Sequence, residues 1–379
     1  MVPSGAQKIE MKTRIRRMPR SSPAFEKDFD TIRSPRSRAA MAIAGLAVAL
    51  GCVFLLSIAL GSIRIPLHDV ISALTGENVA RSTEVIIRDV RLPRSLTAIL
   101  AGAALGIAGL QMQTLFRNAL ADPFVLGISA GASLGVALVV LGGSATVAGV
   151  FGSGIGLAED VLVTMAAIVG AGISLTFVLG LSTRVQNPTT VLILGLMFGY
   201  GTSAFVTILL AGTAPDQLQR WVAWGFGSFS GVTWERLRIF APVIVIGIAI
   251  SWATTKQLNA LLLGENYAQS MGLSVRRMRF ITMIAASMLG GVVTAFCGPI
   301  LFLGIAIPHL CRVLLGTSDH RALIPAVVLM GGIVALTAQI VCLLPGDKGV
   351  LPLNAVTSLI GAPIVVAVLL RSNRGVFTA

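Results

Sequence analysis

Charged residues are scarce in this 379-residue chain, and most of them gather in short segments between long apolar runs. Three arginines, Arg88, Arg91 and Arg94, stand just before a run rich in Gly and Ala. A guanidinium group can hold a carboxylate through two parallel hydrogen bonds, so this cluster has the chemistry to dock an acidic partner. Arginines near a membrane interface also serve as simple anchors, with their stems in apolar surroundings and their charges in water. The residues alone leave both interpretations open.

A second polar group, toward the C-terminus, indicates a charge network rather than a metal site. Its two histidines invite a metal interpretation, because imidazole is a common metal ligand. No third ligand stands at a suitable spacing. An arginine near a helix C-terminus instead complements the helix dipole. We therefore expect a network at the cytoplasmic membrane face, formed by Asn118, His309, Arg312, Asp319, His320 and Arg321.

Missing residues argue against catalysis by this chain. Ser133 and Ser228 lie in Gly-containing contexts that resemble those of membrane serine hydrolases, but no His or Asp stands at a depth that would activate either hydroxyl. The phosphate-binding pattern G-x-x-x-x-G-K-[ST] does not occur, so any ATP hydrolysis must be carried out by a separate chain. We expect a protein that is not an enzyme and that binds no metal or cofactor itself.

Membrane-spanning helices must position these polar segments. The chain is 55% hydrophobic and 12% charged, with a mean hydropathy of +0.87, whereas soluble domains carry about 25% charged residues. Apolar segments of about 20 residues are long enough to cross a bilayer as helices. The sequence predicts an all-α polytopic membrane protein with about ten spans, near residues 39–61, 94–114, 122–142, 161–181, 190–212, 238–256, 280–297, 299–315, 322–343 and 352–371.

The distribution of charge sets the predicted orientation. Residues 1–38 are polar and strongly basic, and we expect a disordered cytoplasmic arm beside anionic lipid rather than a nucleic-acid-binding segment. An even number of spans places both termini on the same side. Placing them inside assigns the whole net charge of +13 to the cytoplasmic segments. Residues 39–371 would form the membrane domain and residues 372–379 a cytoplasmic tail.

The ten spans divide into two halves of five. An odd number of spans per half makes the second half upside down relative to the first. A short echo in the sequence favours this inversion. Pro123 leads a Gly-containing apolar run after an internal loop, and Pro299 leads a similar run after an external one. We therefore predict two inverted five-helix halves.

The longest predicted cytoplasmic loop, residues 256–279, cannot cross the membrane because it carries Glu265 and several basic residues. Its apolar side chains recur at helical spacing, and Gly264 and Gly272 divide it into two short amphipathic helices. Such helices lie at a membrane surface or dock on a partner protein. The loop is therefore a candidate docking surface, and a surface helix without a partner is the alternative.

Residues 217–237 combine three tryptophans and two phenylalanines with small residues. Aromatic rings gather at membrane interfaces, and this segment is predicted to lie at the external one. Large aromatic side chains also suit the mouth of a pathway for a bulky amphipathic ligand. We favour the mouth, and take as candidate pathway residues Trp221, Trp224, Phe226 and Phe229.

Three separate motif blocks resemble the FecCD family, the permease subunits of type II ABC importers. The first joins RLPR (91–94) to RNALADP (117–123), in which Ala119 stands where the family usually has Pro. The second is LGENYAQSMG (263–272), with Met271 in place of the usual Leu. The third block comprises GPILFLGIAIPH (298–309), DHRALIP (319–325) and LPLNAVTSLIGAP (351–363).

The resemblance implies roles for particular residues. Arg91 and Arg94 would dock acidic residues of a substrate-binding protein. The family often adds an Asp and an Arg near the end of the ninth span; here Gln339 and Leu343 stand in their places, and Lys348 is the candidate substitute. The residues that would fit a groove on an ATPase subunit are Leu263, Gly264, Glu265, Ala268, Met271 and Gly272.

The resemblance also implies partners and cargo. The partners would be a second copy or a similar permease, two ABC ATPases that bind ATP and Mg, a periplasmic or lipid-anchored binding protein, and the lipid of a bacterial inner membrane. The cargo would be a bulky metal chelate, a ferric siderophore or haem before cobalamin, carried by alternating access at a dimer interface. The alternative, an ion-coupled secondary transporter of a small organic molecule, would usually need ionisable residues in its spans, and these are nearly absent.

Overall fold

The computed structural model describes residues 35–61, 63–76, 79–151, 159–182, 184–185, 188–344 and 349–374. The chain divides into two units, Met1–Ala42 and Ile43–Ala379, of which the second contains the helix bundle. Most of the predicted arm and the residues 375–379 of the predicted tail lie outside the described ranges. The boundaries of the arm and the tail therefore stay predictions.

Every regular element in these ranges is helical, as the composition predicts. The longer helices are α3 (Pro35–Ala59), α6 (Leu92–Phe116), α7 (Ile128–Phe151), α8 (Glu159–Ser182), α9 (Pro188–Leu210), α11 (Trp234–Ala253), α14 (Val275–Cys297), α15 (Leu303–Leu315), α16 (His320–Leu343) and α17 (Leu353–Arg374). The shorter ones are α4 (Leu67–Thr75), α5 (Arg81–Val85), the π-helix η1 (Ile86–Arg91), the 3₁₀-helix η2 (Pro123–Leu126), α10 (Pro215–Gly225), α12 (Thr255–Leu262) and α13 (Glu265–Ser270).

The predicted spans match the observed helices. Among the described residues, 7 helices are long and apolar enough to cross a membrane. Three shorter apolar helices, Ile128–Leu141, Leu303–Leu315 and Leu353–Ala367, complete the set of ten. The all-α polytopic architecture is therefore confirmed, while the inverted relation of its halves stays a prediction.

Two helices begin later than the sequence predicts, because the chain first passes through left-handed backbone. Gly127 has a φ of 75°, and α7 begins after it rather than at residue 122. Phe302 has a φ of 68°, and α15 begins after it rather than at residue 299. Both proline-led runs thus precede a left-handed residue and then a helix. Apolar composition does not reveal such turns, so the predicted first residues of these two helices were wrong.

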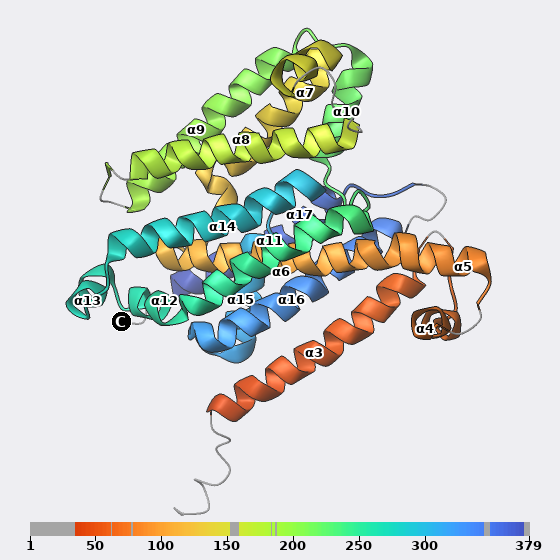
Figure 1. Cartoon of the computed structure of the whole chain (residues 1–379). Coiled ribbons are helices and arrows are strands. Elements are labelled where there is room, and N and C mark those ends of the chain that lie inside the picture. The colour runs from red at the N-terminus through yellow and green to blue at the C-terminus, as the bar shows by residue number, and fades with distance from the viewer. Residues whose placement is uncertain are drawn as a thin grey trace, which may run out of the picture. The chain divides into compact units, whose positions relative to one another are not determined.

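Helix α6 forms the centre of the bundle. Every residue from Ala101 to Leu115 is buried, although the stretch contains two glutamines and a threonine. It packs against α11, α14, α15 and α16, and Figure 1 shows it running between α14 and α16. A helix that is buried all round needs neighbours on every side, so α6 fixes the positions of the others.

Glycines on α6 allow the neighbouring backbones to touch it. Gly102 lies against Gly331 of α16, and Gly109 lies against Gly304 of α15, with a partner carbonyl where a Cβ atom would otherwise stand. Small residues permit this close approach in membrane helices, where van der Waals packing drives association. These two contacts set the distances from α6 to α15 and α16.

We predict that Gly109→Val destabilises the bundle, because any Cβ at this position would overlap the carbonyl of Gly304. Overpacking costs about 1–3 kcal/mol in cores that can adjust, and a backbone carbonyl adjusts poorly. Thermal unfolding of the detergent-solubilised protein measures the effect. Gly172→Val on α8 is the control, since nothing lies within 4 Å of its added Cβ atom. Equal melting temperatures for the two variants would contradict this packing argument.

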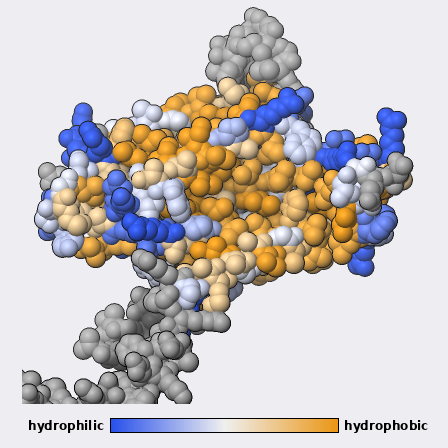
Figure 2. All heavy atoms as spheres, turned by 60° about the horizontal axis from the view of Figure 1, so that its bottom comes forward, coloured by the Kyte–Doolittle hydropathy of each residue, from blue (hydrophilic) through white to orange (hydrophobic). Residues whose placement is uncertain are grey.

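The bundle presents an apolar surface between polar ends. Figure 2 shows a broad hydrophobic area with hydrophilic residues gathered at both edges. Such a surface suits contact with lipid or with another protein. Contiguous exposed apolar patches of this kind are rare in soluble proteins. Helix α9 contributes large side chains that are exposed, namely Ile193, Leu196, Met197, Tyr200, Phe205 and Ile208.

Candidate functional site

The loop predicted to dock a partner folds into two short helices, α12 and α13, at one end of the bundle (Figure 1). Gly264 and Gly272 separate and end them, as the sequence predicts, with φ values of 112° and 83°. Both values lie in the region that favours glycine, because a Cβ atom there approaches the backbone. The path of the loop therefore favours glycine at both positions.

One side of this loop packs on itself and on α14. Leu258, Leu261 and Ala268 form a small apolar cluster with Val275 and Met278. Glu265 at the start of α13 accepts a hydrogen bond from Arg279 of α14, with 3.0 Å between Oε1 and the guanidinium nitrogen. The cluster and the ion pair hold α12 and α13 in a defined arrangement.

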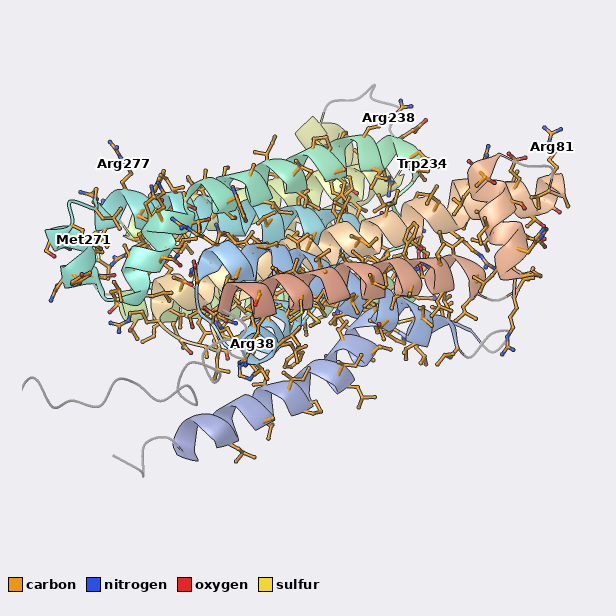
Figure 3. The ribbon with its side chains drawn as sticks, turned by 90° about the horizontal axis from the view of Figure 1, so that it is seen from below. Arg38, Arg81, Trp234, Arg238, Met271 and Arg277 are labelled. Atoms are coloured by element: carbon orange, nitrogen blue, oxygen red, sulfur yellow. The ribbon has the colours of Figure 1, made fainter. Side chains whose placement is uncertain are left out.

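The other side of the loop exposes apolar side chains. Leu263, Tyr267 and Met271 are 65%, 52% and 53% exposed. Figure 3 shows Met271 and Arg277 at one end of the bundle, opposite Arg81, Trp234 and Arg238. Leu263 and Met271 are thus placed to contact a partner, whereas the predicted contact residue Ala268 is buried and supports the loop from within.

A groove of about 770 Å³ lies beside this exposed tip. It is formed by the loop, the start of α14 and the end of α8, and its lining combines basic side chains with an acidic one. The lining residues are Ser182, Val185, Glu265, Gln269, Ser274, Val275, Arg276, Arg277, Arg279 and Phe280. The groove widens the surface that the loop offers to a partner.

Asn259 of α12 connects the loop to the bundle. Its Nδ2 donates to Oδ1 of Asp319 over 2.6 Å, and its Oδ1 accepts from the backbone N–H of His320 over 2.9 Å. The Nδ1 atom of His320 lies 2.7 Å from the same Oδ1, and its Nε2 lies 2.9 Å from Oγ1 of Thr114 on α6. Burial raises the pKa of Asp319, but the Arg321 backbone N–H and Asn259 outweigh it, so this pKa lies below its usual value.

Arg312 of α15 is hydrogen-bonded to α6 through Gln113, the residue before Thr114. It donates to Oε1 of Gln113 over 2.6 Å, and the Nε2 of Gln113 in turn donates to the carbonyls of Gly304 and Ile305. Gln113 and Thr114 therefore tie the end of α6 to α15 and α16. The structure brings the predicted network residues Arg312, Asp319 and His320 to this region.

The other predicted network residues lie differently. Asn118 is exposed, and its Oδ1 accepts a hydrogen bond from the N–H of Leu120 within its own turn. His309 is half-buried on α15. Arg321 contributes its backbone N–H, which donates to Oδ1 of Asp319 at the start of α16. No group of three or more metal-ligating side chains gathers in the part of the chain that the structure describes.

At the opposite end of the bundle, Arg91 caps a helix. The residue is 8% exposed. Its guanidinium donates to the carbonyls of Ile58 and Ala59 at the end of α3, and to the carbonyl of Ile63. The carbonyls of Ile58 and Ala59 have no partner within α3, so the guanidinium satisfies that of Ile58 and shares that of Ala59 with the backbone N–H of Ile65. The predicted docking role of Arg91 must compete with these bonds. Lys348 lies outside the described residues, and Arg94 is half-buried.

The predicted pathway aromatics divide into two groups. Trp221 and Trp224 on α10 are half-buried and Phe226 is exposed, whereas Phe229 is only 2% exposed and belongs to the core. Trp224 lines a cavity of about 170 Å³ together with Ser228, Arg236 and residues of α8 and α14. Phe229 is not among the residues that line this cavity. A pathway role for these residues stays a prediction.

Comparison with known proteins identifies the family. The model of the FecCD transport family matches residues 45–371. The chain belongs to the FecCD transport family. It is 34% identical over 360 residues to the uncharacterized ABC transporter permease protein YvrB of Bacillus subtilis, covering 93% of this chain and 99% of that protein. It is 35% identical over 299 residues to the vitamin B12 import system permease protein BtuC of Salmonella typhi, covering 79% of this chain and 88% of that protein.

A solved structure has the same fold. It is described as an inward-facing conformation of a putative metal-chelate type ABC transporter, and it matches with a TM-score of 0.74 and 25% sequence identity. The match covers 87% of this chain and 98% of the solved one. This FecCD protein is accordingly a polytopic membrane permease of the ABC importer class. The family predicted from the motif blocks is confirmed.

Sequence reasoning missed three residues of this FecCD protein that bind Arg312 or His320, namely Asn259, Gln113 and Thr114. Each is a polar residue near the end of an apolar or amphipathic run, and that is the one signal the sequence offers. Their partners are distant in the chain, 61, 199 and 206 residues away respectively. Spacing along one helix therefore could not have paired them.

We predict that Arg91→Ala destabilises this FecCD protein, because it removes the guanidinium donor from the carbonyl of Ile58 at the buried end of α3. Losing the partner of a buried polar group costs about 1–3 kcal/mol. Thermal unfolding in detergent should show a lower midpoint for this variant. Arg238→Ala removes an exposed arginine at the same end of the bundle and should melt like the wild type. A wild-type midpoint for Arg91→Ala would contradict the capping role.

Proposed function

We propose that this chain imports a bulky metal chelate, a ferric siderophore or haem, across the bacterial inner membrane. The observation that carries the proposal is the glycine-bounded α12–α13 loop with its exposed apolar tip, Leu263 and Met271. Exposed apolar side chains on a rigid loop suit docking into a groove of another protein. The chain has no phosphate-binding loop, so the energy source is a separate ATPase that binds ATP and Mg.

The proposed assembly contains two permease chains, two ATPase subunits and a substrate-binding protein. The second permease is another copy or a similar chain, and the exposed apolar face of α9 offers surface for it or for lipid. The ATPases dock on α12 and α13. The binding protein docks at the opposite end, with Arg94 and Lys348 as the candidate contacts. Both termini lie in the cytoplasm, because that orientation places the net positive charge inside.

The proposed mechanism is alternating access between the two permease chains. Closure of the ATPases on ATP displaces the loop, and the connections of α12 to α6 and α16 carry this movement into the bundle. The cargo is a metal enclosed by its organic ligand, because the pathway side chains are small, apolar and aromatic and offer no cluster of ligands for a bare ion. The chain itself holds no cofactor in this scheme.

Cobalamin is the second candidate cargo, because several relatives at about one-third identity are named vitamin B12 import permeases. Proteoliposomes that contain the permease, its ATPase and its binding protein distinguish the candidates. Uptake is measured with ⁵⁵Fe-ferrichrome, haem and ⁵⁷Co-cyanocobalamin. We expect ATP-dependent accumulation of an iron chelate. Accumulation of cyanocobalamin alone would identify cobalamin as the cargo and contradict the iron chelate. Uptake driven by a proton or sodium gradient without ATP would establish the ion-coupled transporter instead.

We predict that Gly272→Val uncouples the permease from its ATPase while leaving membrane insertion intact. A β-branched residue at a φ of 83° forces the end of α13 to another path, at a cost of about 1–3 kcal/mol. Gly272→Asn is the matched control, because Asn tolerates left-handed backbone. The measurement is the ATPase activity of the purified complex and the amount of ATPase that co-purifies. Normal stimulated activity in Gly272→Val would remove the loop from the coupling step.

A further inference from the structure

The hydrogen bonds around Asn259 form a continuous chain from the loop to the centre of the bundle. Asn259 lies on α12, Asp319 and His320 stand at the start of α16, and Thr114 lies in the last turn of α6. The distances along the chain are 2.6 Å, 2.7 Å and 2.9 Å. His320 and Thr114 are 1% and 2% exposed, so water does not compete for the inner bonds.

The donor and acceptor roles between Asp319, Asn259 and the Nδ1 atom of His320 are fixed by their chemistry. The carboxylate of Asp319 requires a donor, so the Nδ2 atom of Asn259 points to it and Oδ1 points to His320. Because Oδ1 only accepts, the Nδ1 atom of His320 carries a hydrogen. The Nε2 atom of His320 lies 2.9 Å from the hydroxyl oxygen of Thr114, which also donates to the carbonyl of Leu110 over 2.8 Å. The bonds between Asn259 and His320 have one defined arrangement, so a shift of Asn259 changes the bonds of His320 directly.

The position of α12 makes such a shift consequential. Helix α12 packs against both α6 and α16, whereas α13 packs against α12 and α14. Gln113, beside Thr114, binds Arg312 and the carbonyls at the start of α15. A displacement of α12 therefore reaches the inner ends of α6, α15 and α16 through bonds between named atoms. The exposed tip of the loop remains free for the partner.

We propose that Asn259 and His320 are positioning residues that transmit the movement of the docked loop to α6 and α16. The inference rests on the proposed function, because it requires an ATPase that moves the loop. It assigns to Asn259 a role distinct from docking, since Asn259 faces the bundle through its bonds to His320 and Asp319. Leu263 and Met271 supply the contact, and Asn259 supplies the connection.

The test separates ATP hydrolysis from movement of the bundle. A spin label is attached at Ala119→Cys, an exposed position just past the end of α6, in a chain whose exposed Cys52 is replaced by serine. Distances between labels in the full complex with its ATPases are measured without nucleotide and after trapping with ADP and vanadate. In otherwise unaltered protein, trapping should shift the distance distribution. Absence of a shift there would contradict the proposed function itself rather than the transmitting role.

The variants are chosen to break single bonds. Thr114→Val removes the hydroxyl at nearly constant volume, and Thr114→Ser keeps it. Asn259→Ala removes the three hydrogen bonds to Asp319 and His320. Lys256→Ala changes an exposed residue of the same helix. We expect Thr114→Val and Asn259→Ala to hydrolyse ATP within two-fold of wild type while losing most of the nucleotide-dependent shift. Thr114→Ser and Lys256→Ala should keep the shift.

Three results would overturn the proposal. The first is a full shift in Asn259→Ala and Thr114→Val. The second is loss of ATPase binding together with the shift, which would make Asn259 part of the docking surface. The third is equal loss of the shift in Thr114→Ser and Thr114→Val, which would make the site a matter of packing rather than of hydrogen bonding. Thermal unfolding of each variant checks that the bundle is intact.

Discussion

The close contact of glycine backbones around α6 is the constraint on which the rest of the structure depends. Gly102 and Gly109 let α16 and α15 approach until carbonyl groups touch the α6 backbone. Without a hydrophobic driving force between helices in lipid, such packing and a few interhelical hydrogen bonds must hold the bundle together. The polar side chains at the end of α6 can meet their partners on α15 and α16 only because these helices lie so close. Packing at the centre thus positions the hydrogen bonds around Arg312 and His320.

The sequence predicted the spans well because their signal is local. Each apolar run of sufficient length became a helix, and Gly264 and Gly272 marked the ends of two short helices as their conformational freedom suggests. The family motifs added the permease identity, which no hydropathy pattern could supply. Local signals therefore predicted the number and type of the elements. They also predicted that the loop at residues 256–279 forms two short helices.

Contacts between distant segments were less accessible. Arg91 was interpreted by its charge, but its position beside the end of α3 turns that charge toward backbone carbonyls. The role of Asn259 could not be predicted, since nothing near it in the sequence indicates His320 or Thr114. Phe229 resembled its aromatic neighbours and yet is buried in the core. In each case the role follows from a partner many residues away, and a single sequence carries no direct record of such partners.

The helical segment from Arg81 to Phe116 is unbroken over 36 residues, through α5, η1 and α6. At 1.5 Å per residue it is about 54 Å long, whereas the hydrocarbon core of a bilayer is about 30 Å thick. A rod of this length, held at one end through Thr114 and near the other through Arg91, connects the two ends of the bundle. The π-helical turn at Ile86–Arg91 interrupts its α-helical geometry just before the buried part of α6. A tilt of the buried part would displace the end near Thr114 and the end near Arg91 in opposite directions, so one rotation would be felt at both ends of the bundle.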